Sequence, residues 1–185
     1  NYMEAEQLAD AVNDGYLQGL LYAELGRIYR LYYDYPKSIE SYQKAIECYE
    51  RAGKIRHRNY MWYNQSNIYR NLNQFDESEH VLRLALESGK KEKDNTLIEL
   101  CLGSLIMLSV EQNQMQAAKE YYTELEPLVN DDFASSSLLS KLAQMYAIEK
   151  NVPLAIDCLE KGWERAENNT DSVSLYIASA YINNA

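Results

Sequence analysis

Glycine and proline are scarce in this chain: seven glycines and three prolines occur among 185 residues, against seventeen tyrosines. Few residues therefore interrupt a regular backbone, and tyrosine supplies large side chains for packing. The longest apolar run, residues 101–110, is interrupted by Gly103 and Ser104 and is too short to cross a bilayer. The composition favours one domain of long helices over a sheet, and it predicts no membrane insertion.

Motifs that carry catalysis or bind metals are also missing. The chain has no glycine-rich phosphate loop, His-Glu-x-x-His helix, nucleophile elbow or calcium-binding loop. Its two histidines, His57 in a connector over residues 54–58 and His80 on a helix, lack carboxylate or cysteine partners at ligand spacing. Both are expected to be surface residues. We therefore expect no catalytic residue, no metal and no cofactor, and a protein that is not an enzyme.

Three cysteines, Cys48, Cys101 and Cys158, are widely separated, and no Cys-x-x-Cys pair occurs. They are expected to be small packing residues, which favours a cytoplasmic location while a periplasmic one stays open. The chain begins at Asn1 rather than methionine, so the missing signal peptide says nothing about targeting. The net charge of −10 argues against nucleic-acid binding, which depends on neutralising phosphates.

The chain does contain a pattern that recurs after forty residues. Its first copy is Tyr22, Leu25, Gly26 and Tyr29, followed by Ser38, Tyr42 and Ala45. Its second copy is Trp62, Gln65, Ser66 and Tyr69, followed by Ser78, Leu82 and Ala85. Spacings of three and four place each group on one face of a helix, so each copy predicts a pair of helices. Small residues such as Gly26 and Ser38 are expected where the two helices of a pair approach closely.

These residues resemble the tetratricopeptide repeat, whose pattern is W-x₂-L-G-x₂-Y followed by A-x₃-F. The resemblance implies an all-α, right-handed superhelical solenoid of antiparallel helix pairs, with about nine helices. Two departures are the period of forty residues instead of 34 and the loss of the proline that closes each repeat. Both imply longer helices, and they are similar to the arrays of bacterial regulators, including quorum-peptide sensors.

The repeat register divides residues 1–185, treated as a single repeat domain, into segments. The end of a preceding repeat covers 1–15, where Gly15 is expected to end a helix. Four repeats follow at 18–52, 57–89, 95–129 and 136–167, and 171–185 form the first helix of a fifth. The later repeats keep the packing positions Ala118, Tyr122, Ala143, Tyr146 and Ala155.

In tetratricopeptide proteins the first helix of each pair lines a concave face, so the resemblance also implies a groove. The implied groove residues in the first two repeats are Arg27, Arg30, Tyr60, Tyr63, Asn64, Asn67, Arg70 and Asn71. In the later repeats they include Leu100, Ser104, Met107, Glu111, Ser140, Lys141 and Gln144. Asparagine amides pair with peptide backbone and arginine with carboxylates, which suggests an extended, acidic peptide. The plainer interpretation is that these are ordinary polar residues on exposed helix faces.

Two functions stay open at this point. The first is a non-enzymatic scaffold that binds a protein or peptide in the groove. The second is a ligand- or peptide-sensing regulatory domain of a larger signalling or transcriptional protein. Apolar residues on the last predicted helix, Leu175, Ile177, Tyr181 and Ile182, have no second helix to cover them. We therefore expect an excised fragment that self-associates end to end.

Overall fold

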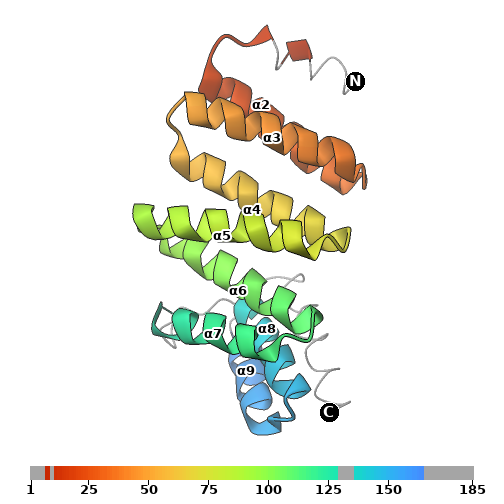
Figure 1. Cartoon of the computed structure of the whole chain (residues 1–185), viewed down its shortest axis with the longest axis vertical. Helices are drawn as coiled ribbons and strands as arrows, with labels where there is room; N and C mark the ends of the chain where they lie inside the picture. Colours follow the sequence, from red (N-terminus) through yellow and green to blue (C-terminus); the bar gives the residue numbers. More distant parts are fainter. Residues whose placement is uncertain (1–6, 9–10, 129–135, 165–185) are drawn as a thin grey trace. The chain divides into compact units, whose positions relative to one another are not determined.

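The computed structural model describes residues 7–8, 11–128 and 136–164 (Figure 1). Within these residues the chain forms eight α-helices and one 3₁₀-helix, and it contains no strand. The helices are α2 (Gly15–Leu31), α3 (Tyr35–Arg51), α4 (Ile55–Asn71), α5 (Phe75–Glu92), α6 (Asn95–Glu111), α7 (Met115–Leu125), η1 (Glu126–Leu128), α8 (Ser136–Ile148) and α9 (Val152–Glu164). None of the described helices is long and apolar enough to span a bilayer. The predicted fifth repeat and its apolar residues lie outside the described residues.

Each turn within a helix pair has the same backbone conformation. Positive φ angles of 58–61° occur at Tyr33, Asn73 and Asn113, which are forty residues apart, and at Lys150, which follows 37 residues later. At each turn the next residue donates its N–H to a carbonyl in the last turn of the preceding helix, as Asp34 does to Tyr29 (2.9 Å). This left-handed residue satisfies the carbonyls that a helix end leaves unpaired and reverses the chain in two or three residues. Consecutive helices therefore pack as antiparallel neighbours.

Among the described residues, three helix limits differ from the sequence prediction by three or more residues. Gly15 does not end a helix: it is the first residue of α2, because the Asp14 carboxylate caps this helix by accepting from the N–H groups of Tyr16 and Leu17 (both 2.9 Å). Helix α5 continues beyond residue 89 to Glu92. Helix α7 ends at Leu125 instead of continuing to residue 129, since Pro127 has no N–H for a helical bond.

Spatial clustering divides the chain into two compact units, residues 1–101 and 102–185, and the boundary falls within α6. The assignment of residues 1–185 to a single domain stays a prediction. In the first unit, α3 packs against both α2 and α4, and α4 packs against α5. The core of this unit contains the rings of Tyr22, Tyr29, Tyr42 and Tyr49.

Helices α2 and α3 approach each other closely at Gly26. A Cβ built on Gly26 would lie 2.7 Å from two ring carbons of Tyr42, a side chain that is itself only 2% exposed. On the same side, the buried Ser38 hydroxyl donates to the Gly26 carbonyl (2.6 Å). A glycine inside a helix costs about 1 kcal/mol relative to alanine. Burying an aromatic ring is worth about 2 kcal/mol, so the close contact offsets that cost.

The second helix pair, α4 and α5, has an equivalent serine-to-carbonyl hydrogen bond, with Ser66 in place of Gly26 as the acceptor. The Ser78 hydroxyl on α5 donates to the Ser66 carbonyl on α4 (2.9 Å), and both serines are 1% exposed. At the equivalent positions of the later repeats, Ala118, Ala143 and Ala155 are fully buried. Small residues at these positions allow the backbones to approach, and the hydroxyl adds a bond in the first two repeats.

The second unit contains α7, α8 and α9. Helices α8 and α9 pack against each other, and Leu139, Leu142 and Leu159 are buried. Across to α7, the rings of Tyr122 and Tyr146 meet edge to face with centroids 6.0 Å apart. The Lys119 ammonium on α7 lies 2.8 Å from the Glu149 carboxylate, which is 19% exposed. These contacts join consecutive helices of this unit.

We expect Gly26→Ala to destabilise the protein by roughly 1–3 kcal/mol, because the new methyl group meets a buried ring that cannot move aside. Gly15→Ala is the matched control, since its Cβ would make ordinary contacts of 3.6 and 3.7 Å. The control should be neutral or stabilising by up to about 1 kcal/mol. Chemical denaturation measures both changes. Equal stabilities of the two variants would contradict the packing role of Gly26.

Candidate functional site

The two predicted groove residues of the first repeat lie on α2. Arg27 and Arg30 are exposed. The Arg27 guanidinium pairs with Glu24 on its own helix (2.8 Å), and both side chains are at least half exposed. Arg30 lies near the Tyr42 hydroxyl: burial raises the pKa of Tyr42, and Arg30 partly opposes that rise. Arg27 therefore already forms a surface ion pair with Glu24, whereas Arg30 lies beside Tyr42, a residue of the core.

The predicted groove residues of the second repeat lie on α4. Tyr60, Tyr63, Asn64, Asn67 and Arg70 are half-buried, and Asn71 is exposed. Their spacing of three and four residues places them on one side of the helix. Residues between them, such as Met61, Gln65 and Ile68, are buried in the core. The structure therefore brings the α4 residues into one half-buried row, which we call the α4 row.

The members of the α4 row differ in what they can offer a ligand. The Asn67 amide donates to the Tyr63 carbonyl of its own helix (3.1 Å), so one of its donors is already used. The Tyr60 ring lies 6.0 Å from the Arg56 guanidinium. In the part of the chain that the structure describes, the side chains of Tyr63 and Asn64 have no hydrogen-bond partner. These two residues are free to bond to another molecule.

The groove positions implied for the later repeats are different. Ser104, Ser140 and Gln144 are at most 8% exposed, and the Gln144 amide is 3.5 Å from the Ser140 hydroxyl. These three side chains therefore do not line an exposed groove. The exposed polar character that the resemblance implies is thus confined, among these positions, mainly to α2 and α4.

Sequence reasoning missed a cluster of rings around His57. It placed His57 in a connector and on the surface, which is wrong: His57 lies in the first turn of α4 and is half-buried. Its ring lies 5.2 Å from both Tyr16 and Tyr49, and Nε2 is 3.3 Å from the Tyr16 hydroxyl. Burial raises the pKa of Tyr49 to about 12. The one signal in the sequence was Gly19, whose missing side chain leaves room for the Tyr49 ring.

Groups that could carry covalent or metal chemistry are not assembled in the described residues. No cluster of three or more histidine, cysteine or acidic side chains there could hold a metal ion. Cys48, Cys101 and Cys158 are all buried and unpaired. Burial raises the pKa of the Cys101 thiol to about 12 and that of Cys158 to about 11. These two thiols are therefore protonated at neutral pH, which makes them poor nucleophiles.

An all-helical chain of antiparallel pairs with a repeating turn belongs to the class of helical repeat proteins. A family model described as the fourth ARM domain of tetratricopeptide repeat protein 21 matches residues 38–129. None of the curated proteins matches the chain in sequence. The family model and the arrangement of the helices agree on a narrower group: this chain has a tetratricopeptide-like repeat fold.

Two solved structures show the same fold. BtubC (BKLC) from P. vanneervenii is similar over 88% of this chain and 69% of its own, with a TM-score of 0.70 and 17% sequence identity. YrrB, described as a tetratricopeptide repeat protein with an unusual peptide-binding site, is similar over 90% of this chain and 78% of its own. Its TM-score is 0.53 and its identity is also 17%. At this identity the likeness concerns the fold alone.

We expect the Cys101 and Cys158 thiols not to react with a disulfide reagent at mildly alkaline pH while the protein is folded. Their raised pKa values keep them protonated, and the core shields them from the reagent. Leu17→Cys is the control, because Leu17 is 51% exposed on α2 and a thiol there should react at once. Labelling followed by mass spectrometry measures each site. Rapid labelling of either native thiol without unfolding would contradict this expectation.

Proposed function

We propose that the protein is a non-enzymatic scaffold that binds a protein or an extended peptide through α2 and α4. The α4 row carries this proposal, because a half-buried line of tyrosine, asparagine and arginine combines contact area with hydrogen-bonding groups. Half-buried side chains have already lost part of their freedom, so less entropy is lost when a ligand binds. The description of YrrB as a peptide-binding protein supports the same use of this fold.

Two arginines suggest the charge of the ligand. Arg30 and Arg70 occupy equivalent positions in successive repeats, each in the last turn of the first helix of its pair. Arginine binds carboxylates through two parallel hydrogen bonds, and two arginines at a repeat interval suit a chain with regularly placed acidic groups. On the α4 row, Tyr63 and Asn64 offer a hydroxyl and an amide to the peptide backbone. The ligand that fits best is an extended peptide with acidic side chains or a free carboxyl end.

Binding to an array of acidic peptides tests the proposal, followed by fluorescence titration of a bound peptide. We expect Arg30→Ala with Arg70→Ala to weaken binding by at least about tenfold, because charged hydrogen bonds contribute about 1.5–3 kcal/mol each. Asn64→Ala should weaken it further, since this amide has no partner among the described residues. Raising the salt concentration should weaken binding of the parent protein and have a smaller effect on the double variant.

Arg83→Ala is the matched control. Arg83 lies on α5, its side chain is 60% exposed, and it pairs with Glu79 one turn away (2.6 Å). Its loss removes one positive charge from a different helix, whereas the double variant removes two. If Arg83→Ala weakens binding as much as the double variant does, the effect is one of net charge. If the double variant stays folded and binds normally, the surface proposed here is not the binding site.

A further inference from the structure

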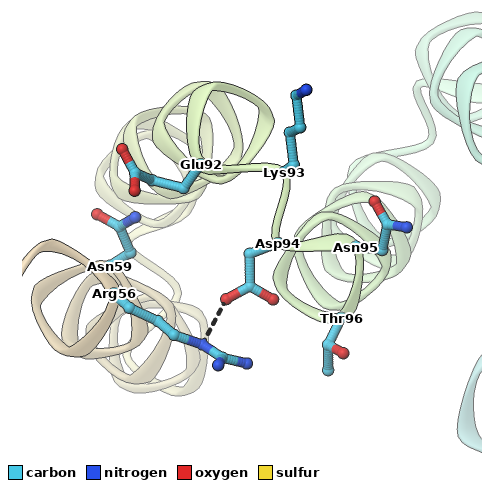
Figure 2. A pocket seen from close by; sticks show the side chains of 7 residues that line it. All are labelled: Arg56, Asn59, Glu92, Lys93, Asp94, Asn95 and Thr96. Atoms are coloured by element: carbon cyan, nitrogen blue, oxygen red, sulfur yellow. Dashed lines mark ion pairs between the residues drawn. The ribbon is translucent and has the colours of Figure 1, made fainter.

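A hollow of about 350 Å³ lies where the start of α4, the end of α5 and the start of α6 meet (Figure 2). All of its lining residues belong to the first unit. Arg56 and Asn59 come from α4, Glu92 and Lys93 from the end of α5, and Asp94, Asn95 and Thr96 from the start of α6. This hollow, which we call the α4–α6 junction, was not among the sites predicted from the sequence.

The most unusual group at the junction is the Asn59 amide. Asn59 is 1% exposed, and its Oδ1 accepts from Nε and Nη2 of Arg58 (3.2 and 3.0 Å). These two bonds fix the orientation of the amide, because only its oxygen can accept from a guanidinium. Its Nδ2 is buried and has no hydrogen-bond partner in the described part of the chain. A buried donor without a partner is costly, so this position favours the arrival of an acceptor.

A buried acceptor borders the same hollow. The Asp94 side chain is 8% exposed, and its Oδ1 caps α6 by accepting from the Leu97 N–H (3.2 Å). Its Oδ2 lies 2.8 Å from Nε of Arg56, but among the described residues it takes part in no properly oriented hydrogen bond. The Arg56 side chain is 68% exposed. Because the Arg56 end of the ion pair extends into solvent on a long, flexible side chain, its guanidinium can move aside and yield its place to a ligand.

The preceding repeat shows that the fold does not require a polar junction. At the positions forty residues earlier, Tyr16 stands for Arg56, Gly19 for Asn59 and Lys54 for Asp94. There the Tyr49 ring packs so close to Gly19 that a Cβ would lie 2.7 Å from it, and the Lys54 ammonium lies 5.1 Å above the Tyr16 ring.

At the α4–α6 junction the large and small residues are exchanged. Gly89 takes the position of Tyr49, and the larger Asn59 takes the position of Gly19. The earlier junction also borders a hollow, of about 550 Å³, but no buried polar atom in the described residues is left unpaired there. Of the two junctions, only the second therefore contains a buried donor and a buried acceptor, Asn59 Nδ2 and Asp94 Oδ2, without hydrogen-bond partners among the described residues.

The charges narrow the class of ligand. Figure 2 shows Lys93 and Asn95 pointing away from the space between Arg56, Glu92 and Asp94. Two carboxylates against one guanidinium disfavour an anion. An ammonium or guanidinium ion offers no acceptor to Asn59. A neutral amide offers both an acceptor and a donor.

We propose that the α4–α6 junction binds a neutral amide group, either a primary carboxamide or a peptide amide. The amide oxygen accepts from Nδ2 of Asn59, and the amide N–H donates to Oδ2 of Asp94 in place of Arg56. This site is independent of the peptide surface proposed above, although the Tyr60 ring of the α4 row lies beside Arg56.

Titration with small amides, followed by NMR, tests the proposal on the whole chain. Propionamide should shift the side-chain NH₂ signal of Asn59 and the backbone signals of Asn95 and Thr96. Propionate has nearly the same shape but carries a charge and no donor, and it should leave these signals unchanged. N-methylacetamide distinguishes a peptide amide from a primary carboxamide as the group that the junction binds. Binding of N-methylacetamide indicates a peptide amide, and binding of propionamide alone indicates a side-chain carboxamide. Equal shifts with propionate, or no shift with either amide, would overturn the proposal.

Isosteric variants provide the second test. Asn59→Asp keeps the acceptor for Arg58 and removes the donor, and Asp94→Asn keeps the helix cap and removes the charge. Each should weaken amide binding about tenfold, the effect of losing one well-made hydrogen bond. The double variant exchanges donor and acceptor, so it should recover binding with the amide reversed. Lys93→Ala, whose side chain points away, should bind as the parent does.

The fold of each variant is checked by its backbone spectrum. Should Asn59→Asp not fold, Asp94→Asn and the double variant still decide the matter. Folded variants that all bind propionamide as the parent does would show that Asn59 and Asp94 are not its partners.

Discussion

The structure depends on how closely two helices of a pair can approach. At Gly26 the missing side chain lets the Tyr42 ring lie directly against the α2 backbone, and the Ser38 hydroxyl bonds to the Gly26 carbonyl at the same level. The contact fixes the distance between α2 and α3 and also their register, because the bond joins one residue on each helix. Ser78 and Ser66 repeat it in the next pair. With this distance set, the large tyrosines of the first unit fill the remaining volume.

A second size relationship operates within each pair, near the other end of its two helices. The Gly19 position on the first helix faces the Tyr49 position on the second helix of the same pair, and a large residue at one position meets a small residue at the other. In the first junction glycine faces tyrosine, and the space is filled by rings that include His57. In the second, asparagine occupies the first position and Gly89 the other. Where the first junction has a ring cluster, the second therefore has two polar atoms, Asn59 Nδ2 and Asp94 Oδ2, without hydrogen-bond partners among the described residues.

The two proposed sites use different physical properties of the same first unit. The surface on α2 and α4 relies on the exposed Arg30 and the half-buried Arg70, whose attraction for an acidic ligand weakens with salt. The α4–α6 junction relies on a buried amide and a buried carboxylate, where removal from water makes each unpaired group more costly. The whole chain is acidic, with a net charge of −10, so its composition alone does not reveal the role of the arginines on α2 and α4.

The sequence by itself determined the class of fold and the repeat. Residues at spacings of three and four, in a forty-residue register, decide which helix faces are apolar. Gly26 and Ser38 indicate where two helices meet. Both inferences succeed because such packing depends on residue size and local periodicity. Tertiary structure alone decided the rest. Asn67 bonds to its own helix, His57 lies among rings, and Asn59 is buried with no partner for its Nδ2 in the part of the chain that the structure describes. Each of these outcomes depends on residues from other turns or helices. Burial and hydrogen bonding are properties of the assembled pairs, and a periodic pattern assigns positions to a face without saying what covers them.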